Sequence, residues 1–374
     1  MKAKTKTHQR LMAVVLSLIM VLTGSLLVAC GGGGTSNSGS SSGGVSGGGG
    51  GGVSGGELNV FIWAEYLPDS VVTKFTEETG IKVNVSNYSS NEDLLAKVQS
   101  SNEGIYDVVV PSDYMVKMMA EEGLLEELDK DSLPNLSNLD TSFLDPSFDP
   151  GNTYSLPYMG GVAMIVYNKN VVTEPITGYE QLFDPQYANS IVALDDFRAV
   201  IGMTAKSLGY SLNTTDDAEL AQVATRLEEL KPNVRLLDSD SPKSAMLSGE
   251  TSIGYMWNAE VAICQEEDDS FEAVFPSEGC YLFLDNLSVL KGAKNRENAL
   301  KFINFILEPE VSKMISEEFP YLNPNKAAVA LLPDSYRDNP VSNVPAEVIA
   351  KGEYVQDLGA DVVKYDELWT EFTR

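Results

Sequence analysis

Strand and helix patterns alternate along the chain after position 56, and this alternation constrains the fold more than any other feature. Strand patterns at 58–63, 81–85 and 106–110 are separated by helical patterns at 69–80 and 91–101. The run at 106–110 is rich in valine, which is typical of a strand buried on both faces. Strands that alternate with helices favour a parallel sheet covered by helices. The sequence therefore predicts an α/β fold.

The same alternation of strand and helix patterns occurs further along the chain. Strands are predicted at 191–194 and 252–257, and helices at 198–208, 217–230 and 295–308. This part of the chain is longer than about 250–300 residues, the size at which one hydrophobic core usually stops growing. Two domains are therefore expected.

The N-terminus has the pattern of a secretory signal. Basic residues precede an apolar stretch at 11–28, and a small residue, Ala29, comes before Cys30. A cysteine at this place resembles a bacterial lipobox, which implies that signal peptide 1–29 is removed and that the Cys30 thiol carries diacylglycerol. The alternative is a plain transmembrane helix, since roughly 18 apolar residues can span a bilayer. The Gly/Ser-rich segment after the cysteine favours the leader.

Residues 30–56 are predicted to be a lipid-anchored tether. After the cysteine they are almost wholly Gly and Ser, so they bury little apolar surface and form a flexible coil. Such a coil has an end-to-end distance of roughly 25–30 Å. We therefore expect the protein at the extracytoplasmic face of the cell membrane, held there by its acyl chains.

Charge and residue usage exclude several classes of protein. The formal net charge is -28, which disfavours nucleic acid and suits a cationic partner. The one histidine, His8, lies in the leader, so the mature chain lacks the residue most often used in triads and acid–base catalysis. The sequence predicts no catalytic residue, no metal and no cofactor, although a carboxylate-pair glycoside hydrolase stays open as an alternative.

A series of motifs occurs in a fixed order along the chain. Two examples are FIWAEY at 61–66 and YDVVVPSDY at 106–114. Together the motifs resemble the bacterial polyamine-binding proteins, the spermidine/putrescine receptors of ABC importers, over 57–369. The resemblance implies a two-lobed periplasmic-binding-protein-like fold. Each lobe would be a mostly parallel sheet flanked by helices, with the ligand cleft between the lobes.

The resemblance also implies where the chain passes between lobes. One lobe would comprise 57–160 and 283–329, and the other 161–282 and 330–374. Both have sizes typical of domains. The implied partners are a polyamine, the permease subunits of an ABC transporter and the membrane through the lipid anchor. We expect a monomer.

Ligand-binding residues are carried over from the resemblance. A polyamine needs carboxylates for its ammonium groups and aromatic faces along its methylenes, where each cation–π contact contributes about 0.5–2 kcal/mol. The implied set is Trp63, Tyr66, Ser112, Tyr114, Asp196, Trp257, Phe283, Asp285 and Tyr321. The alternatives are core or rim aromatics, solvated loop acids and, for Ser112, a helix N-cap.

The choice of polyamine is left open by a departure from the family pattern. Ala199 stands where spermidine-type members carry a glutamate. Glu260, three residues after Trp257, stands where putrescine-type members carry an aspartate, so it is added to the predicted ligand-binding set. This favours putrescine, or one half of spermidine. A receptor for another small organic solute is the alternative within the same class.

After Cys30 only two cysteines remain, Cys264 and Cys280. In an exported protein such a pair favours a disulfide over a thiol nucleophile. The bond would close a loop contributing roughly 3 kcal/mol. The alternative is two unpaired buried thiols that pack as small apolar groups.

Overall fold

The computed structural model describes residues 55–374 of the chain. The predicted signal peptide 1–29, the lipid-anchor residue Cys30 and nearly all of tether 30–56 lie outside the described residues. Among the residues described, no helix is both long enough and apolar enough to cross a bilayer.

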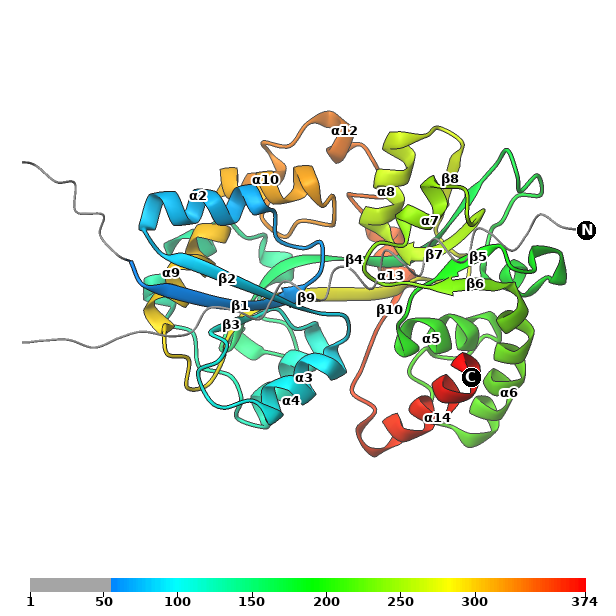
Figure 1. Ribbon diagram of the computed structural model, residues 1–374, viewed down its shortest axis with the longest axis horizontal. Helices are drawn as coiled ribbons and strands as arrows, with labels where there is room; N and C mark the ends of the chain where they lie inside the picture. The colour runs from blue at the N-terminus through cyan, green and yellow to red at the C-terminus, as the bar shows by residue number, and fades with distance from the viewer. Residues whose placement is uncertain (1–54) are drawn as a thin grey trace, which may run out of the picture. The chain divides into compact units, whose positions relative to one another are not determined.

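All strands of the described chain belong to one ten-stranded sheet (Figure 1). They are β1 (Glu57–Trp63), β2 (Lys82–Tyr88), β3 (Val108–Val109), β4 (Ser155–Asn168), β5 (Ile191–Ala193), β6 (Val234–Leu237), β7 (Ile253–Trp257), β8 (Phe271–Val274), β9 (Tyr281–Val289) and β10 (Glu353–Tyr354). Their order is β2-β1-β3-β9-β4-β7-β5-β6, with β10 beside β9 and β8 beside β4.

Helices cover both faces of this sheet (Figure 1). They are α2 (Asp69–Thr79), α3 (Asn91–Ser100), α4 (Asp113–Glu121), α5 (Phe197–Ser207), α6 (Asp217–Leu230), α7 (Lys243–Leu247), α8 (Asn258–Glu267), α9 (Arg296–Ile306), α10 (Pro309–Glu318), α11 (Lys326–Val329), α12 (Asp334–Arg337), α13 (Ala346–Lys351) and α14 (Val362–Thr373). Short 3₁₀ turns lie in several of the connections.

Two groups of parallel strands are joined by two long antiparallel strands. β1 pairs in parallel with β2 and β3, and β5 pairs in parallel with β6 and β7. We call the first group with α2–α4, α9 and α10 lobe 1, and the second with α5–α8 and α14 lobe 2. β4 and β9 run antiparallel from one lobe to the other, with Cα partners from Ser155↔Ser288 to Ala163↔Tyr281. The predicted sheets are therefore parts of one sheet; the predicted lobe boundaries stay a prediction.

Local chemistry explains where two predicted elements end. Gly80 closes α2 with φ 70°, a conformation that glycine adopts without strain, and its N–H donates to the carbonyl of Thr76. The predicted strand 106–110 is shorter than expected, because only Val108–Val109 pair as β3. The next carbonyl, of Val110, accepts side-chain hydrogen bonds from Trp63 and Tyr88 instead of a strand partner.

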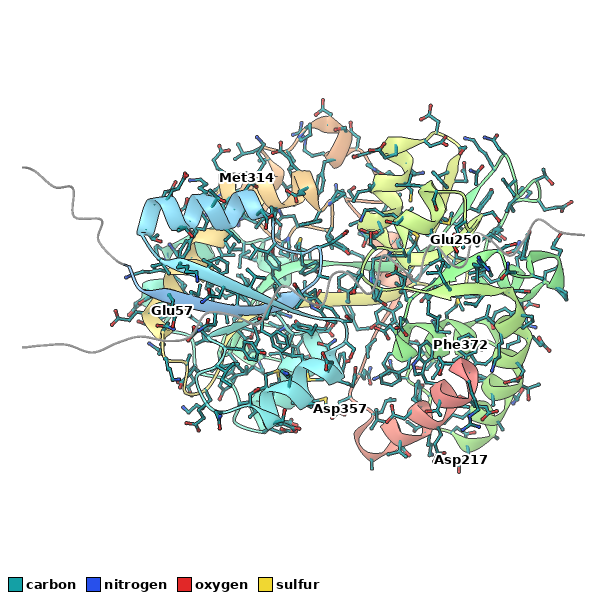
Figure 2. All side chains as sticks on the ribbon, in the orientation of Figure 1. Glu57, Asp217, Glu250, Met314, Asp357 and Phe372 are labelled. Atoms are coloured by element: carbon teal, nitrogen blue, oxygen red, sulfur yellow. The ribbon has the colours of Figure 1, made fainter. Side chains whose placement is uncertain are left out.

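Each lobe has its own buried packing. In lobe 1 the ring of Phe75 lies 5.2 Å from Phe302, which packs α2 against α9. In lobe 2 the C-terminal helix α14 buries Tyr365 and Phe372, and the hydroxyl of Tyr365 donates to the carbonyl of Thr214 at 2.9 Å. Figure 2 labels Phe372 on this helix, close to α6. The chain end is thus part of the fold of lobe 2.

The predicted disulfide between Cys264 and Cys280 is wrong, because both are free and buried. Cys264 belongs to α8, whereas Cys280 precedes β9 and lies near Lys206 of α5. Figure 1 shows α8, which carries Cys264, and α5, which lies near Cys280, on opposite sides of the sheet. Burial raises the pKa of both thiols to about 12, so they pack as small apolar groups.

Candidate ligand-binding site

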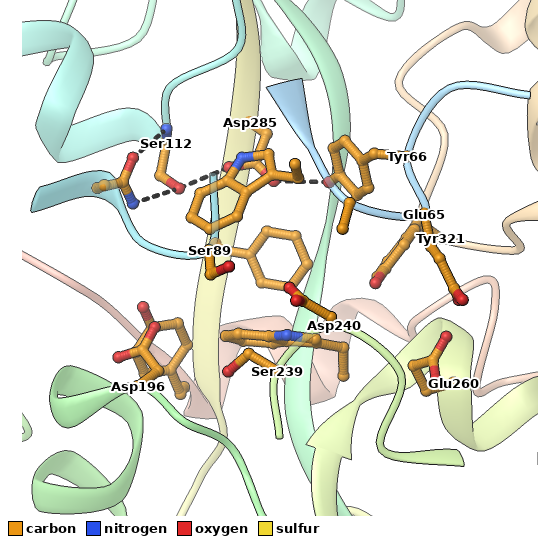
Figure 3. A pocket seen from close by; sticks show the side chains of 16 residues that line it. Glu65, Tyr66, Ser89, Ser112, Asp196, Ser239, Asp240, Glu260, Asp285 and Tyr321 are labelled. Carbon is orange, nitrogen blue, oxygen red and sulfur yellow. Dashed lines mark hydrogen bonds between the residues drawn. The ribbon is translucent and has the colours of Figure 1, made fainter. Parts of the chain in front are cut away.

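A pocket lies between the two lobes and collects almost all of the predicted site residues (Figure 3). The predicted residues that line it are Trp63, Tyr66, Ser112, Asp196, Trp257, Glu260, Phe283, Asp285 and Tyr321. They come from the ends of β1, β3 and β7, from β9, from the first turn of α8, and from the connections after β5 and α10. The carboxyl ends of parallel strands thus meet here, as is usual for ligand sites of α/β sheets.

Asp285 is a buried acid of this pocket. It belongs to β9 and is 4% exposed. Its Oδ1 accepts a hydrogen bond from the Ser112 hydroxyl at 2.6 Å, and its Oδ2 accepts one from the Tyr66 hydroxyl at 2.6 Å. Both donors are neutral. Within residues 55–374 no basic side chain forms an ion pair with Asp285, so a buried carboxylate faces the cleft without a cation.

Burial decides the protonation of Asp285. Removal from water raises its pKa from the ordinary aspartate value to about 7, although the hydrogen bonds from Ser112 and Tyr66 favour the charged form and lower it. A cation placed beside this carboxylate would favour the ionised form. The site is therefore prepared for a positively charged group.

The residues around Asp285 are held in place by further hydrogen bonds. Ser112 stands at the N-cap of α4, but its hydroxyl serves Asp285 and makes no cap bond. Asn91 fixes it from both sides, because Asn91 Nδ2 donates to Ser112 Oγ at 3.0 Å and Ser112 N donates to Asn91 Oδ1 at 3.1 Å. The indole Nε1 of Trp63 donates to the Val110 carbonyl at 2.9 Å, which fixes the ring at the end of β1.

Aromatic rings form a connected set along the pocket. Trp257 lies 5.2 Å from Phe283, and Phe283 lies 5.9 Å from Tyr321, both edge-to-face. Tyr321 in turn lies 5.2 Å from Tyr66, the donor to Asp285. Such a set offers apolar contact for methylene groups and electron-rich faces for a cation.

Asp196 lies on the opposite wall, at the start of α5. Its side chain caps this helix by accepting a hydrogen bond from Ala199 N at 3.0 Å. Burial raises the pKa of Asp196 above its usual range, and this cap bond partly offsets the shift. Ala199 itself is fully buried in α5 and does not line the pocket.

Tyr114 is the one predicted residue that does not line this pocket. Its hydroxyl donates to Glu92 at 2.9 Å, and the guanidinium of Arg198 lies 5.7 Å from the centre of its ring. Tyr114 belongs to α4 of lobe 1 and Arg198 to α5 of lobe 2, so the pair contacts across the lobes. The role of Tyr114 as a ligand wall stays a prediction.

The amino-acid sequence matches the bacterial extracellular solute-binding proteins over residues 70–343. The chain belongs to this family. The spermidine/putrescine-binding periplasmic protein of Escherichia coli K12 is 39% identical over 313 residues, which cover 83% of this chain and 90% of that protein. The resemblance predicted from the motifs is thus confirmed.

Solved structures support the two-lobed fold of this solute-binding protein. The spermidine/putrescine ABC transporter substrate-binding protein of Streptococcus pneumoniae is 34% identical with a TM-score of 0.72, covering 85% of this chain and 98% of that one. A lipoprotein of Treponema pallidum is 29% identical with a TM-score of 0.75, covering 84% and 99%. The predicted fold class is confirmed.

Three charged residues of this solute-binding protein lie at the site without having been predicted. Glu65 and Asp240 line the pocket, and Lys243 forms ion pairs with Glu65 and with Glu260. Glu65 could have been predicted, since it stands between Trp63 and Tyr66 in the FIWAEY motif at 61–66. No local pattern in the sequence pointed to Lys243.

No group of three or more potential metal ligands is found in residues 55–374.

Proposed function

We propose that this protein is the substrate-binding component of an ABC importer for a polyamine, putrescine or spermidine. It takes up the ligand in the cleft between its lobes and delivers it to the permease subunits without chemical turnover. The observation that carries the proposal is Asp285, a buried carboxylate with neutral donors and a pKa raised to about 7. A ligand ammonium supplies the cation that this group lacks.

The composition of the pocket favours an organic dication over other small solutes. Three lining acids, Asp196, Asp240 and Asp285, form no ion pair with a basic residue of the described chain. The aromatic rings between them suit methylene groups and cations alike. An anionic ligand would meet acids on both walls, and the ammonium of Lys243 at one end of the pocket is already bound by two carboxylates.

Each lining residue has a role in this proposal. Asp285 and Asp196 bind ammonium groups, while Ser112 and Tyr66 hold Asp285 in place. The walls that contact the methylenes are Trp63, Trp257, Phe283 and Tyr321, and Tyr114 is kept as a further wall residue. Glu260 closes one end of the site.

Anchoring belongs to the proposal as well. The mature chain would be held by the acylated Cys30 at the extracytoplasmic face of the membrane and act there as a monomer. The pattern of the leader supports this, as does the similarity to a lipoprotein of Treponema pallidum.

Isothermal titration calorimetry of the purified protein tests the function. Putrescine, spermidine and spermine are titrated beside a panel of sugars, and each bound ligand is recovered and analysed afterwards. We expect a polyamine to bind with one-to-one stoichiometry and to be recovered unchanged. Binding of a sugar alone, or conversion of any ligand, would reject the proposal.

A further inference from the structure

A lysine lies between two acids at one end of the cleft. Lys243, the first residue of α7, donates from Nζ to Glu260 Oε1 at 2.9 Å and to Oε2 at 3.2 Å, and it pairs with Glu65. Its Nζ also donates to Ser241 Oγ at 3.2 Å. Figure 3 shows Glu65 and Glu260 on one side of the pocket and Asp196 on the other. Lys243 is not itself among the residues that line the pocket, but its ammonium lies against two acids, Glu65 and Glu260, that line one end of it.

The surroundings of Lys243 make this ammonium part of the site. Its side chain is 17% exposed and that of Glu260 is 5% exposed, so water screens their attraction only weakly. An ammonium has three N–H donors, and Glu65, Glu260 and Ser241 supply an acceptor for each. The main-chain N–H of Lys243 donates to Glu260 Oε2 at 3.3 Å, which ties α7 to α8. Every donor of the lysine is thus satisfied in this position.

The lysine joins the two lobes through these contacts. Glu65 lies in the connection after β1 of lobe 1, whereas Lys243 and Glu260 belong to α7 and α8 of lobe 2. A ligand ammonium at this end would have to lie against both acids. Because the lysine ammonium already lies between these acids, a ligand ammonium would be repelled by it. The two acids, already neutralised by the lysine, would attract the ligand ammonium only weakly.

We propose that Lys243 is a specificity-determining residue that limits how many ligand ammonium groups the cleft accepts. Its ammonium fills the position that the outermost ammonium of a longer polyamine would take between Glu65 and Glu260. Three lining acids form no ion pair with a lysine of residues 55–374 and can bind the ammonium groups of a shorter ligand: Asp196, Asp240 and Asp285. The site therefore favours a diamine over a triamine. This inference rests on the proposed function, because it concerns which polyamine the same cleft selects.

The substitution Lys243→Met tests the inference, because it removes the charge and keeps an unbranched side chain. Calorimetry gives the ratio of the putrescine Kd to the spermidine Kd for wild type and variant. We expect this ratio to rise by about tenfold in the variant, because spermidine then binds more tightly. Its third ammonium can take the place of the lysine ammonium.

A matched control distinguishes the effect of removing the charge at position 243 from the effect of removing any one positive charge. Lys206 on α5 has a side chain of similar exposure, 15%, and pairs with Glu353 at 3.5 Å, outside the residues that line the pocket. Lys206→Met should leave the ratio at the wild-type value. Lys243→Gln is a second test variant in case Lys243→Met does not fold, since its amide still donates to Glu260. Thermal unfolding verifies that each variant is folded.

The outcomes separate this inference from the proposed function. A wild-type ratio in a folded Lys243 variant overturns the inference, and so does a shift toward putrescine. A shift of the same size in Lys206→Met also overturns it, because the effect would then come from net charge. If the wild-type protein binds neither amine, the proposed function itself has failed.

Discussion

The hydroxyl of Tyr66 donates a hydrogen bond to Asp285 Oδ2 at 2.6 Å, although 219 positions separate the two residues in the sequence. Tyr66 follows β1 and Asp285 lies within β9, a strand that passes from one lobe to the other. The bond therefore ties the start of lobe 1 to the strand between the lobes. A second hydroxyl, from Ser112, donates to the other oxygen, Oδ1, at 2.6 Å. Both oxygens of the Asp285 carboxylate are therefore held in a fixed orientation in the cleft.

The substitution Asp285→Asn should weaken polyamine binding by about 2–5 kcal/mol, because it leaves a buried ligand ammonium without its counter-charge. Calorimetry with putrescine and spermidine measures the effect. Asp366→Asn, an exposed position on α14, is the matched control and should bind as wild type. If Asp285→Asn binds as tightly as wild type, the site assignment is wrong.

Binding should strengthen as the pH rises from 6 to 8. The ligand-free protein holds a proton on Asp285 below about pH 7, and a ligand ammonium requires the ionised carboxylate. Alkylammonium groups stay charged over this range. Calorimetry at pH 6 in buffers of different ionisation enthalpy should therefore detect proton release on binding, and Asp285→Asn should lose most of it. Proton release that is equal in wild type and variant would place the titrating group elsewhere.

The substitution Tyr66→Phe should weaken binding by about 1–3 kcal/mol at pH 7. The lost hydrogen bond stabilised the charged carboxylate, so its removal raises the pKa of Asp285 further. The loss of affinity should therefore be smaller at pH 9 than at pH 7. Tyr106→Phe, which changes a hydroxyl on a ring stacked against Phe61 outside this pocket, is the control. A loss that is independent of pH would mean that Tyr66 contributes only packing.

Alkylation followed by peptide mass spectrometry should find Cys264 and Cys280 as thiols. In the folded protein both should react slowly, because they are buried and their pKa is raised to about 12. After denaturation without a reductant both should react completely. A disulfide-linked peptide that contains both cysteines would contradict the structure.

The substitution Cys30→Ala should release the protein from the membrane fraction into the medium, because the acylated thiol is its proposed anchor. Cell fractionation and immunoblotting measure the distribution. Cys264→Ala serves as the control for loss of a cysteine and should leave the protein with the membrane. Retention of Cys30→Ala at the membrane would mean that another segment anchors the chain.

Much of the fold and of the site could be predicted from the sequence, because their signals are local. The helix ending at Gly80 follows from the conformational freedom of one residue. Trp63 and Ser112 stand in short motifs whose order along the chain resembles one family, Asp285 was carried over from the same resemblance, and the structure brings all three to one pocket. Periodicity also located β1, α5 and α6 to within a residue or two.

Other features depended on contacts between distant segments, which no local pattern encodes. Lys243 lies 178 positions from Glu65, and its ammonium meets that acid only where α7 of one lobe approaches the β1 connection of the other. Cys264 and Cys280 are close in sequence, yet both are free: Cys264 belongs to α8 and Cys280 lies near α5, and these two helices cover different faces of the sheet. The sequence by itself determined the element types, the family and three of the acids of the cleft, Asp196, Glu260 and Asp285. Only the tertiary structure decided which charges meet and which thiols stay apart, because both depend on the faces that packed elements turn toward each other.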